Sequence, residues 1–295
     1  MRGNLGWSAA NSKIDHHSNI AAALGPDAPD VIWAWCLRHL FVDWNWAGLR
    51  EALQHGFSVT RSNSNFWHGL ATYHFLEERI EEAMAAQLKG LELDPFTVEN
   101  LYYLGATYFW HYSLEEARSV NDRVLQGAPE HRGAQELRGW ILAFEERYDE
   151  ALLAFEQLSP GIEYPNHRLS CLGYVLAMKG DHARALACRE QLELVVKADR
   201  SHNSAVTYAV LNTALGDFDT AFHYLELAVT HKIGTVRHCT GNRLLAPLRD
   251  DPRLDRIRQL IGPVPAYGET PEYSREPTAG RQGLRDSHPP PSGMR

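Results

Sequence analysis

Small residues recur along this chain every 34 residues, between large apolar ones. In a 34-residue frame that starts at residue 30, the eighth place holds Leu37, Ala71, Gly105, Gly139 and Gly173. The twentieth place holds Leu49, Ala83, Ala117, Ala151 and Ala185, and after two inserted residues the frame resumes with Ala209 and Ala221. A fixed period of this length indicates a fold built from stacked repeats.

Each window predicts two antiparallel helices joined by a tight turn. Small residues at the eighth and twentieth places allow two helices to approach closely, while large apolar residues fill the space between them. Pro95 and Pro129 stand near the ends of their windows, where proline cannot continue a helix. Gly180 and Gly216 are each followed by Asp, which predicts a turn at the glycine and a helix capped by the aspartate.

This pattern resembles the tetratricopeptide repeat over roughly Asp30 to Lys232. The resemblance implies an all-α fold, an α-solenoid in which antiparallel helix hairpins wind into a right-handed superhelix. Some places depart from the pattern: Gln87, Asn121 and Arg189 stand where the repeat usually has a large apolar residue, and Gln135 and Arg138 replace apolar residues in the fourth unit. These places are predicted to pack less tightly or to lie out of frame. The six predicted units are 30–63, 64–97, 98–131, 132–165, 166–199 and 202–235.

The flanking segments carry weaker signals. Residues 1–29 are predicted to be either a flexible leader or a degenerate half-repeat that caps the array. Residues 236–262 predict a capping helix, with an apolar stripe at helical spacing from Leu254 to Ile261. Residues 263–295 hold seven of the fifteen prolines and predict a disordered tail, with order lost beyond about Tyr267.

Three segments carry a second resemblance. The sequence DWNWAGLREAL at 43–53 looks like a phrase from the tetratricopeptide regions of bacterial winged-helix transcriptional activators, class III adenylate cyclases and serine/threonine kinases. The segments at 215–229 and 246–262, which include RDDPRL, resemble the end of the same regions. The resemblance implies a sensory or interaction part that lacks its effector domain, and a role in bacterial signalling or transcriptional control.

Charge and composition limit the kinds of partner and the cellular compartment that we expect for this protein. A net charge of −8 argues against a nucleic-acid-binding face. The four cysteines form no CxxC pair, the first thirty residues show no secretory signal, and no run of 18 apolar residues occurs. We therefore expect a cytoplasmic protein with protein or peptide partners, and with neither nucleic acid nor membrane as a direct partner.

Motifs of catalysis are missing from the sequence. It contains no HExxH, Walker, GxGxxG or GxSxG motif, so we expect no catalysis and no cofactor. The best metal candidate joins His167 and Cys171, four residues apart, with His182 and Cys188 on the next helix. Zinc sites usually have tighter paired spacings. We favour packing of both cysteines between helices, both histidines on the surface, and no metal.

Aromatic residues on the predicted first helices point to a binding surface. In the repeat that the sequence resembles, the second, fifth, ninth, twelfth and thirteenth places of the first helix usually line a concave groove. Flat rings there would suit capture of a peptide or a helical segment, although some could instead pack adjacent repeats. The groove residues that the resemblance implies are His68, Phe75, Tyr102, Phe109, Trp110, Trp140, Phe144 and Tyr174.

Two other functions stay open at this point. One is an enzyme or metal-dependent protein whose site holds His68, His74 and His111. The other is a self-assembling structural protein, a homo-oligomer that associates through residues 1–29 and the helix at Leu254–Ile261.

Overall fold

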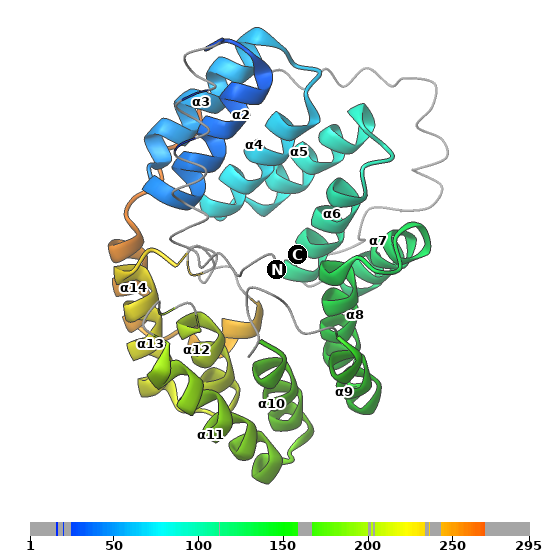
Figure 1. The fold of residues 1–295 in the computed structure, drawn as a ribbon, viewed down its shortest axis with the longest axis vertical. Coiled ribbons are helices and arrows are strands. Elements are labelled where there is room, and N and C mark those ends of the chain that lie inside the picture. The colour runs from blue at the N-terminus through cyan, green and yellow to red at the C-terminus, as the bar shows by residue number, and fades with distance from the viewer. Residues whose placement is uncertain are drawn as a thin grey trace, which may run out of the picture.

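The computed structural model describes residues 25–111, 113–158, 167–199, 204–233 and 243–268, with residues 16, 20, 202 and 236. In this part of the chain the regular structure is helical, and twelve helices pair into six hairpins (Figure 1). The predicted leader or half-repeat at 1–29 lies mostly outside the described residues, as does the tail from residue 269. The hairpins are α2 (Pro29–Arg38) with α3 (Trp46–Val59), α4 (Ser64–Leu76) with α5 (Ile80–Leu93), α6 (Val98–Trp110) with α7 (Leu114–Gly127), α8 (Arg132–Phe144) with α9 (Tyr148–Gln157), α10 (His167–Lys179) with α11 (His182–Ala198), and α12 (Ala205–Ala214) with α13 (Phe218–Thr230).

The turns inside the last two hairpins confirm the interpretation of their glycines. Gly180 and Gly216 have φ of 85° and 77°, the left-handed region that glycine adopts without a steric penalty. Asp181 accepts a hydrogen bond from the backbone N–H of Arg184, and Asp217 caps α13 in the same way. Each hairpin falls within one of the 34-residue windows to within one residue.

Close helix packing depends on the small residues, though not equally at each site. A Cβ added at Gly139 would lie 2.7 Å from the ring of Phe155, and one added at Gly173 would lie 2.7 Å from Leu211. At Gly105 the nearest atom, on the side chain of Leu137, would lie at an ordinary 3.5 Å. Of the three glycines at the eighth place, those of the fourth and fifth hairpins therefore tolerate the least added volume.

Two of the polar residues that depart from the pattern lie in frame and are buried, whereas Arg189 is half-buried. Gln87 and Asn121 are each 1% exposed. Gln87 donates to the carbonyl of Asn100 at 3.2 Å, and Asn121 donates to the carbonyl of Ala134 at 2.9 Å. Each acceptor lies 13 residues further on, in the first helix of the next hairpin. A hydrogen bond between hairpins therefore pairs the amide nitrogen at both places, while Asn121 also lines a surface pocket and its Oδ1 has no partner.

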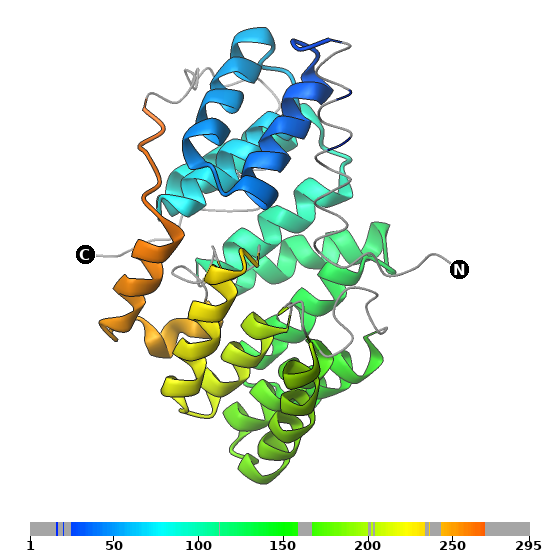
Figure 2. The same ribbon diagram turned by 60° about the vertical axis from the view of Figure 1, so that its left-hand side comes forward.

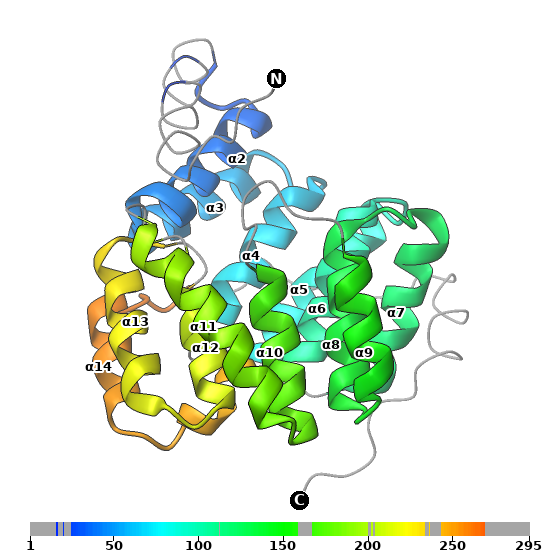
Figure 3. The same ribbon diagram turned by 60° about the horizontal axis from the view of Figure 1, so that its bottom comes forward.

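The array curls until its last hairpin meets its first. After α13 come the 3₁₀ helix η3 (Arg243–Leu248), α14 (Arg253–Ile261) and an extended segment. Figure 1 shows α14 between α13 and α3, and Figure 3 shows the same neighbourhood from below. Lys232 donates to the carbonyl of Asp43 at 3.0 Å, which joins the two ends of the array directly.

Helix α14 covers the end of the sixth hairpin. Leu254 is 2% exposed and Ile257 is fully buried, whereas Leu260 is 49% exposed. The guanidinium of Arg253 lies 4.4 Å from the ring centre of Phe222 on α13. Among the described residues no helix is long and apolar enough to span a bilayer.

Residues 262–267, here called the clasp, run from α14 along the first two hairpins (Figure 2). Tyr267 is 1% exposed, and its ring centre lies 5.4 Å from that of Tyr73. The hydroxyl of Tyr73 donates to the carbonyl of Pro265 at 2.6 Å, and Glu77 accepts the N–H of Tyr267 at 2.9 Å. Residues 263–267 of the predicted tail are thus held in place, because side chains of α4 bond the backbone of the clasp and one large ring is buried; the expected loss of order concerned residues beyond about Tyr267.

Candidate functional site

Burial divides the eight predicted groove residues into two groups. Phe109, Trp140 and Tyr174 are buried, with exposed fractions of 0%, 5% and 4%. Trp140 meets Phe155 of its own hairpin at 4.9 Å between ring centres, and Tyr174 of the next hairpin at 5.4 Å. For Trp140 the packing alternative therefore holds. The half-buried group consists of His68, Phe75, Tyr102, Trp110 and Phe144.

A segment of the chain itself covers part of the predicted groove. The guanidinium of Arg243 lies 4.2 Å from the ring centre of Phe144 and 5.3 Å from that of Phe109. It also donates to the carbonyl of Phe109 at 3.4 Å, and the hydroxyl of Tyr174 donates to the carbonyl of Leu244 at 3.0 Å. We call residues 243–248 the plug. Sequence reasoning missed this segment because it lies outside the repeat frame.

A second set of rings lies along the first helices of the hairpins, outside the part of the surface that the plug covers. Trp33 meets His68 edge-on at 6.2 Å, and His68 stacks on Tyr103 at 4.1 Å. Tyr102 then lies 5.2 Å from Tyr103 and 4.9 Å from His131. We call these five residues the ladder. It includes His68 and Tyr102 as predicted, whereas Trp33, Tyr103 and His131 were not predicted.

The ladder has an acidic border, which is formed by Glu99. Burial lowers the pKa of His68, although the hydrogen bond to Gln87 and the charge of Glu99 oppose that effect. Burial raises the pKa of the Tyr103 phenol, and Glu99 adds to the rise. Glu99 also lies 3.2 Å from the ring nitrogen of His131. Tyr103 is 38% exposed, so the ladder offers a partly accessible aromatic surface.

The remaining predicted rings lie near the ends of their helices. Phe75 is half-buried in the last turn of α4. Trp110 is half-buried at the end of α6, and its ring meets that of Phe109 edge-on at 5.1 Å.

Among the described residues, the histidines of the alternative enzyme site belong to no group that could hold a metal ion. His74 is fully buried and bonds Glu77 at 2.8 Å, while His111 is exposed after the end of α6. Within the described ranges, the group of donors close enough for a metal ion consists of Glu136, His167 and Cys171.

The surface position expected for His167 is wrong. His182 is exposed as predicted, but His167 is half-buried and its Nε2 lies 2.7 Å from a carboxylate oxygen of Glu136. Cys171 is fully buried and Cys188 is half-buried. Burial alone would lower the pKa of His167, but the neighbouring Cys171 and Glu136 raise it well above its ordinary value.

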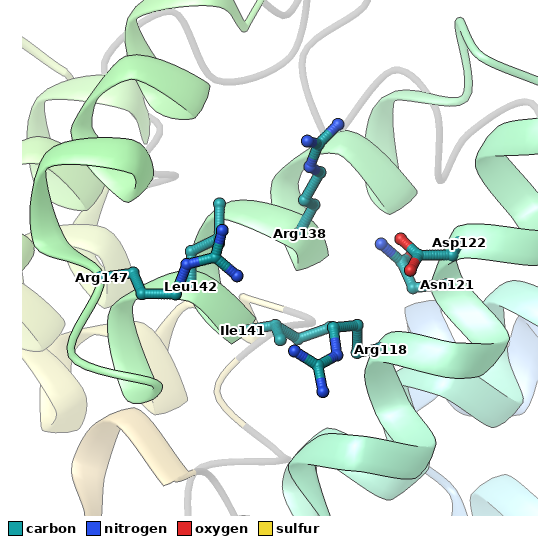
Figure 4. A pocket seen from close by; sticks show the side chains of 7 residues that line it. All are labelled: Arg118, Asn121, Asp122, Arg138, Ile141, Leu142 and Arg147. Carbon is teal, nitrogen blue, oxygen red and sulfur yellow. The ribbon is translucent and has the colours of Figure 1, made fainter.

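A surface pocket between α7 and α8 holds three guanidinium groups (Figure 4). Arg118 pairs with Glu145 at 3.2 Å, and Arg147 pairs with Glu150 at 2.6 Å. Carboxylates therefore balance two of the three cations, so we assign no ligand to this pocket.

Comparisons with known proteins agree with this architecture. The family model described as tetratricopeptide repeat matches residues 64–97, which is the second hairpin. No curated protein matches the chain in sequence.

Two solved structures are similar in fold. A chain of the APC/C hetero-tetramer Cut9–Hcn1 superposes with a TM-score of 0.56 at 15% identity, over 86% of this chain and 46% of that one. This chain therefore spans less than half of that protein. A tetratricopeptide repeat protein from Parabacteroides merdae ATCC 43184 superposes with a TM-score of 0.55 at 16% identity, over 82% of this chain and 91% of that one. The chain thus has the fold of a tetratricopeptide-repeat α-solenoid, and its second hairpin matches the sequence model of that repeat.

Proposed function

We propose that the chain is a non-catalytic scaffold that binds a peptide or helical segment of a partner protein on the first helices of its hairpins. The observation that carries the proposal is the ladder, whose rings follow one another from the first hairpin to the start of the fourth. Rings bury a large area and have few rotatable bonds to freeze, so they favour peptide capture.

The plug supports this proposal from within the molecule. Side chains and a backbone carbonyl on α6, α8 and α10 hold a short 3₁₀ segment of the chain, through one guanidinium and one carbonyl. A peptide bound on the neighbouring ladder would use the same kinds of contact. Glu99 at the border of the ladder favours a ligand with apolar and cationic side chains.

We place the function in bacterial signalling or transcriptional control, in the cytoplasm. The support is the resemblance of segments 43–53, 215–229 and 246–262 to tetratricopeptide regions of such regulators. The negative net charge favours a protein partner over nucleic acid.

A peptide array followed by affinity measurement tests the binding function. For a peptide selected on the wild-type protein, the double substitution His68→Ala and Tyr103→Ala should weaken affinity at least about tenfold, equivalent to about 1.4 kcal/mol. The matched control is Phe96→Ala, which removes a ring that is 90% exposed between α5 and α6. Trp140 is unsuitable for this test, because its substitution would report core packing.

Two outcomes would refute the proposal. One is a folded double variant that binds selected peptides as tightly as the wild type. The other is an equal loss of affinity in Phe96→Ala, which would show that any aromatic surface residue contributes.

A further inference from the structure

Three side chains of different ligand type meet between the fourth and fifth hairpins. Glu136 comes from α8, while His167 and Cys171 lie one turn apart on α10. A spacing of four residues places the imidazole and the thiol on the same face of the helix. One ligand atom of each residue lies within 4.8 Å of the other two.

We propose that Glu136, His167 and Cys171 bind a divalent cation of the zinc class, with a fourth position open to water. Zinc accepts carboxylate oxygen, imidazole nitrogen and thiolate sulfur, and it is most often tetrahedral. This inference is independent of peptide binding by the ladder.

The present spacing is close to what such an ion needs. Bonds of about 2.0–2.3 Å place tetrahedral ligand atoms about 3.5 Å apart. The pair formed by His167 and Glu136, now 2.7 Å apart, must open slightly, while the other two separations already lie within 4.8 Å. Both of these side chains are 27% exposed, so they have room to adjust, whereas Cys171 is fixed in the core.

The charges also suit a dication. The Glu136 carboxylate and a Cys171 thiolate together offset two positive charges. Burial raises the pKa of the Cys171 thiol, and a thiol must lose its proton to bind a metal ion. Binding therefore releases the thiol proton to solvent as the metal–sulfur bond forms.

Two neighbours affect the site in opposite directions. The indole N–H of Trp140 donates to Glu136 at 3.3 Å, which orients the carboxylate. Arg132 on the same helix lies close enough to lower the pKa of both Glu136 and Cys171, so its charge opposes a bound cation. Arg132→Ala should accordingly tighten metal binding.

Titration of the full chain with Co²⁺ tests the site, because thiolate ligation gives a sulfur-to-cobalt charge-transfer band. We expect the band to saturate at one equivalent and to disappear when Zn²⁺ displaces the cobalt. Cys171→Ser should abolish the band and weaken metal affinity by more than about 100-fold, beyond the effect of losing an outer-sphere partner. Cys188→Ser is the matched control and should keep the band.

The same experiment separates this site from adventitious binding by the fifteen histidines, which gives no sulfur band. If wild-type protein shows no such band, or if the band persists in Cys171→Ser, the proposal is wrong. Because Cys171 is buried, His167→Gln serves as a second variant whose fold is checked by circular dichroism. Zn²⁺ should raise the melting temperature of the wild type and leave that of His167→Gln unchanged. An equal rise in both would also overturn the proposal.

Discussion

The plug and the ladder show two outcomes for aromatic residues on the same series of helices. His68 and Tyr102, near the starts of α4 and α6, keep part of their surface exposed. Phe109 and Phe144, near the ends of α6 and α8, receive the guanidinium of Arg243. All four residues lie on the first helices of their hairpins. The plug, which lies outside the repeats, nevertheless covers two of them and leaves the other two accessible to a partner.

The difference teaches that closure of the array shapes its binding surface. The segment after the sixth hairpin first fills one part of the aromatic surface and then fastens itself to the first two hairpins through the clasp. An open array of the same hairpins would expose both groups of rings. Substitutions that release each segment therefore test whether the two regions really differ.

Release of the clasp should have the largest effect. Tyr267→Ala removes a fully packed ring from between Tyr73 and His74, which should lower the free energy of unfolding by about 3–5 kcal/mol. Urea unfolding monitored by circular dichroism measures the loss. Tyr267→Phe is the matched control, since no partner is found for the buried hydroxyl, and it should be neutral or slightly stabilising. If Tyr267→Ala is as stable as the wild type, the clasp does not hold the end of the array against its first two hairpins.

Release of the plug should have the next largest effect. Arg243→Ala removes a desolvated cation–π contact worth about 2 kcal/mol and a hydrogen bond worth about 1 kcal/mol. We expect a loss of roughly 2–3 kcal/mol in thermal or urea unfolding. Arg243→Lys keeps the charge but loses the planar group, so its stability should lie between those of the wild type and Arg243→Ala. A variant as stable as the wild type would mean that the plug lies loosely on the surface.

Acidification should weaken the clasp more modestly. Burial lowers the pKa of His74, against opposing contributions from Glu77 and Glu82 and a supporting one from Arg79. The unfolded chain therefore takes up a proton more readily than the folded one. Stability is complete above about pH 6.5 and falls as the pH drops through the lowered pKa of the folded state.

The measurement compares melting temperatures at neutral and mildly acidic pH. His74→Gln removes the titrating ring beside Tyr267 and should reduce the acid-induced drop. His68→Gln does the same in the ladder, where burial also lowers the pKa. If neither variant changes the drop, the acid sensitivity arises elsewhere, for example at His39.

Local chemistry made much of the fold predictable. Gly180 and Gly216 marked turns because the backbone angles there favour glycine, and proline marked the ends of units. The hydrogen bonds of Gln87 and Asn121 could not be predicted, because a sequence shows a polar side chain but not the carbonyl that pairs with its amide nitrogen. That carbonyl lies 13 residues away, across a boundary between hairpins.

The position of the plug on the aromatic surface could not be predicted, for a related reason. Arg243 and Phe109 are 134 residues apart, and no periodicity links a segment outside the repeats to a ring inside them. The same limit applies to the proposed metal site. His167 and Cys171 share a helix face that spacing reveals, whereas Glu136 comes from another hairpin and only the packing of α8 on α10 places it there.

The smallest effect on stability should come from the ladder. Tyr103→Ala removes a ring that is 38% exposed and stacks on His68, so we expect a loss within about 0.5 kcal/mol. Phe96→Ala, at a ring that is 90% exposed, sets the baseline for a ring that packs against little. A loss in Tyr103→Ala as large as that in Arg243→Ala would remove the distinction between the two regions, because the ladder would then be part of the core. A small loss of stability together with weaker peptide binding would show that these rings contribute to binding a partner rather than to the stability of the fold.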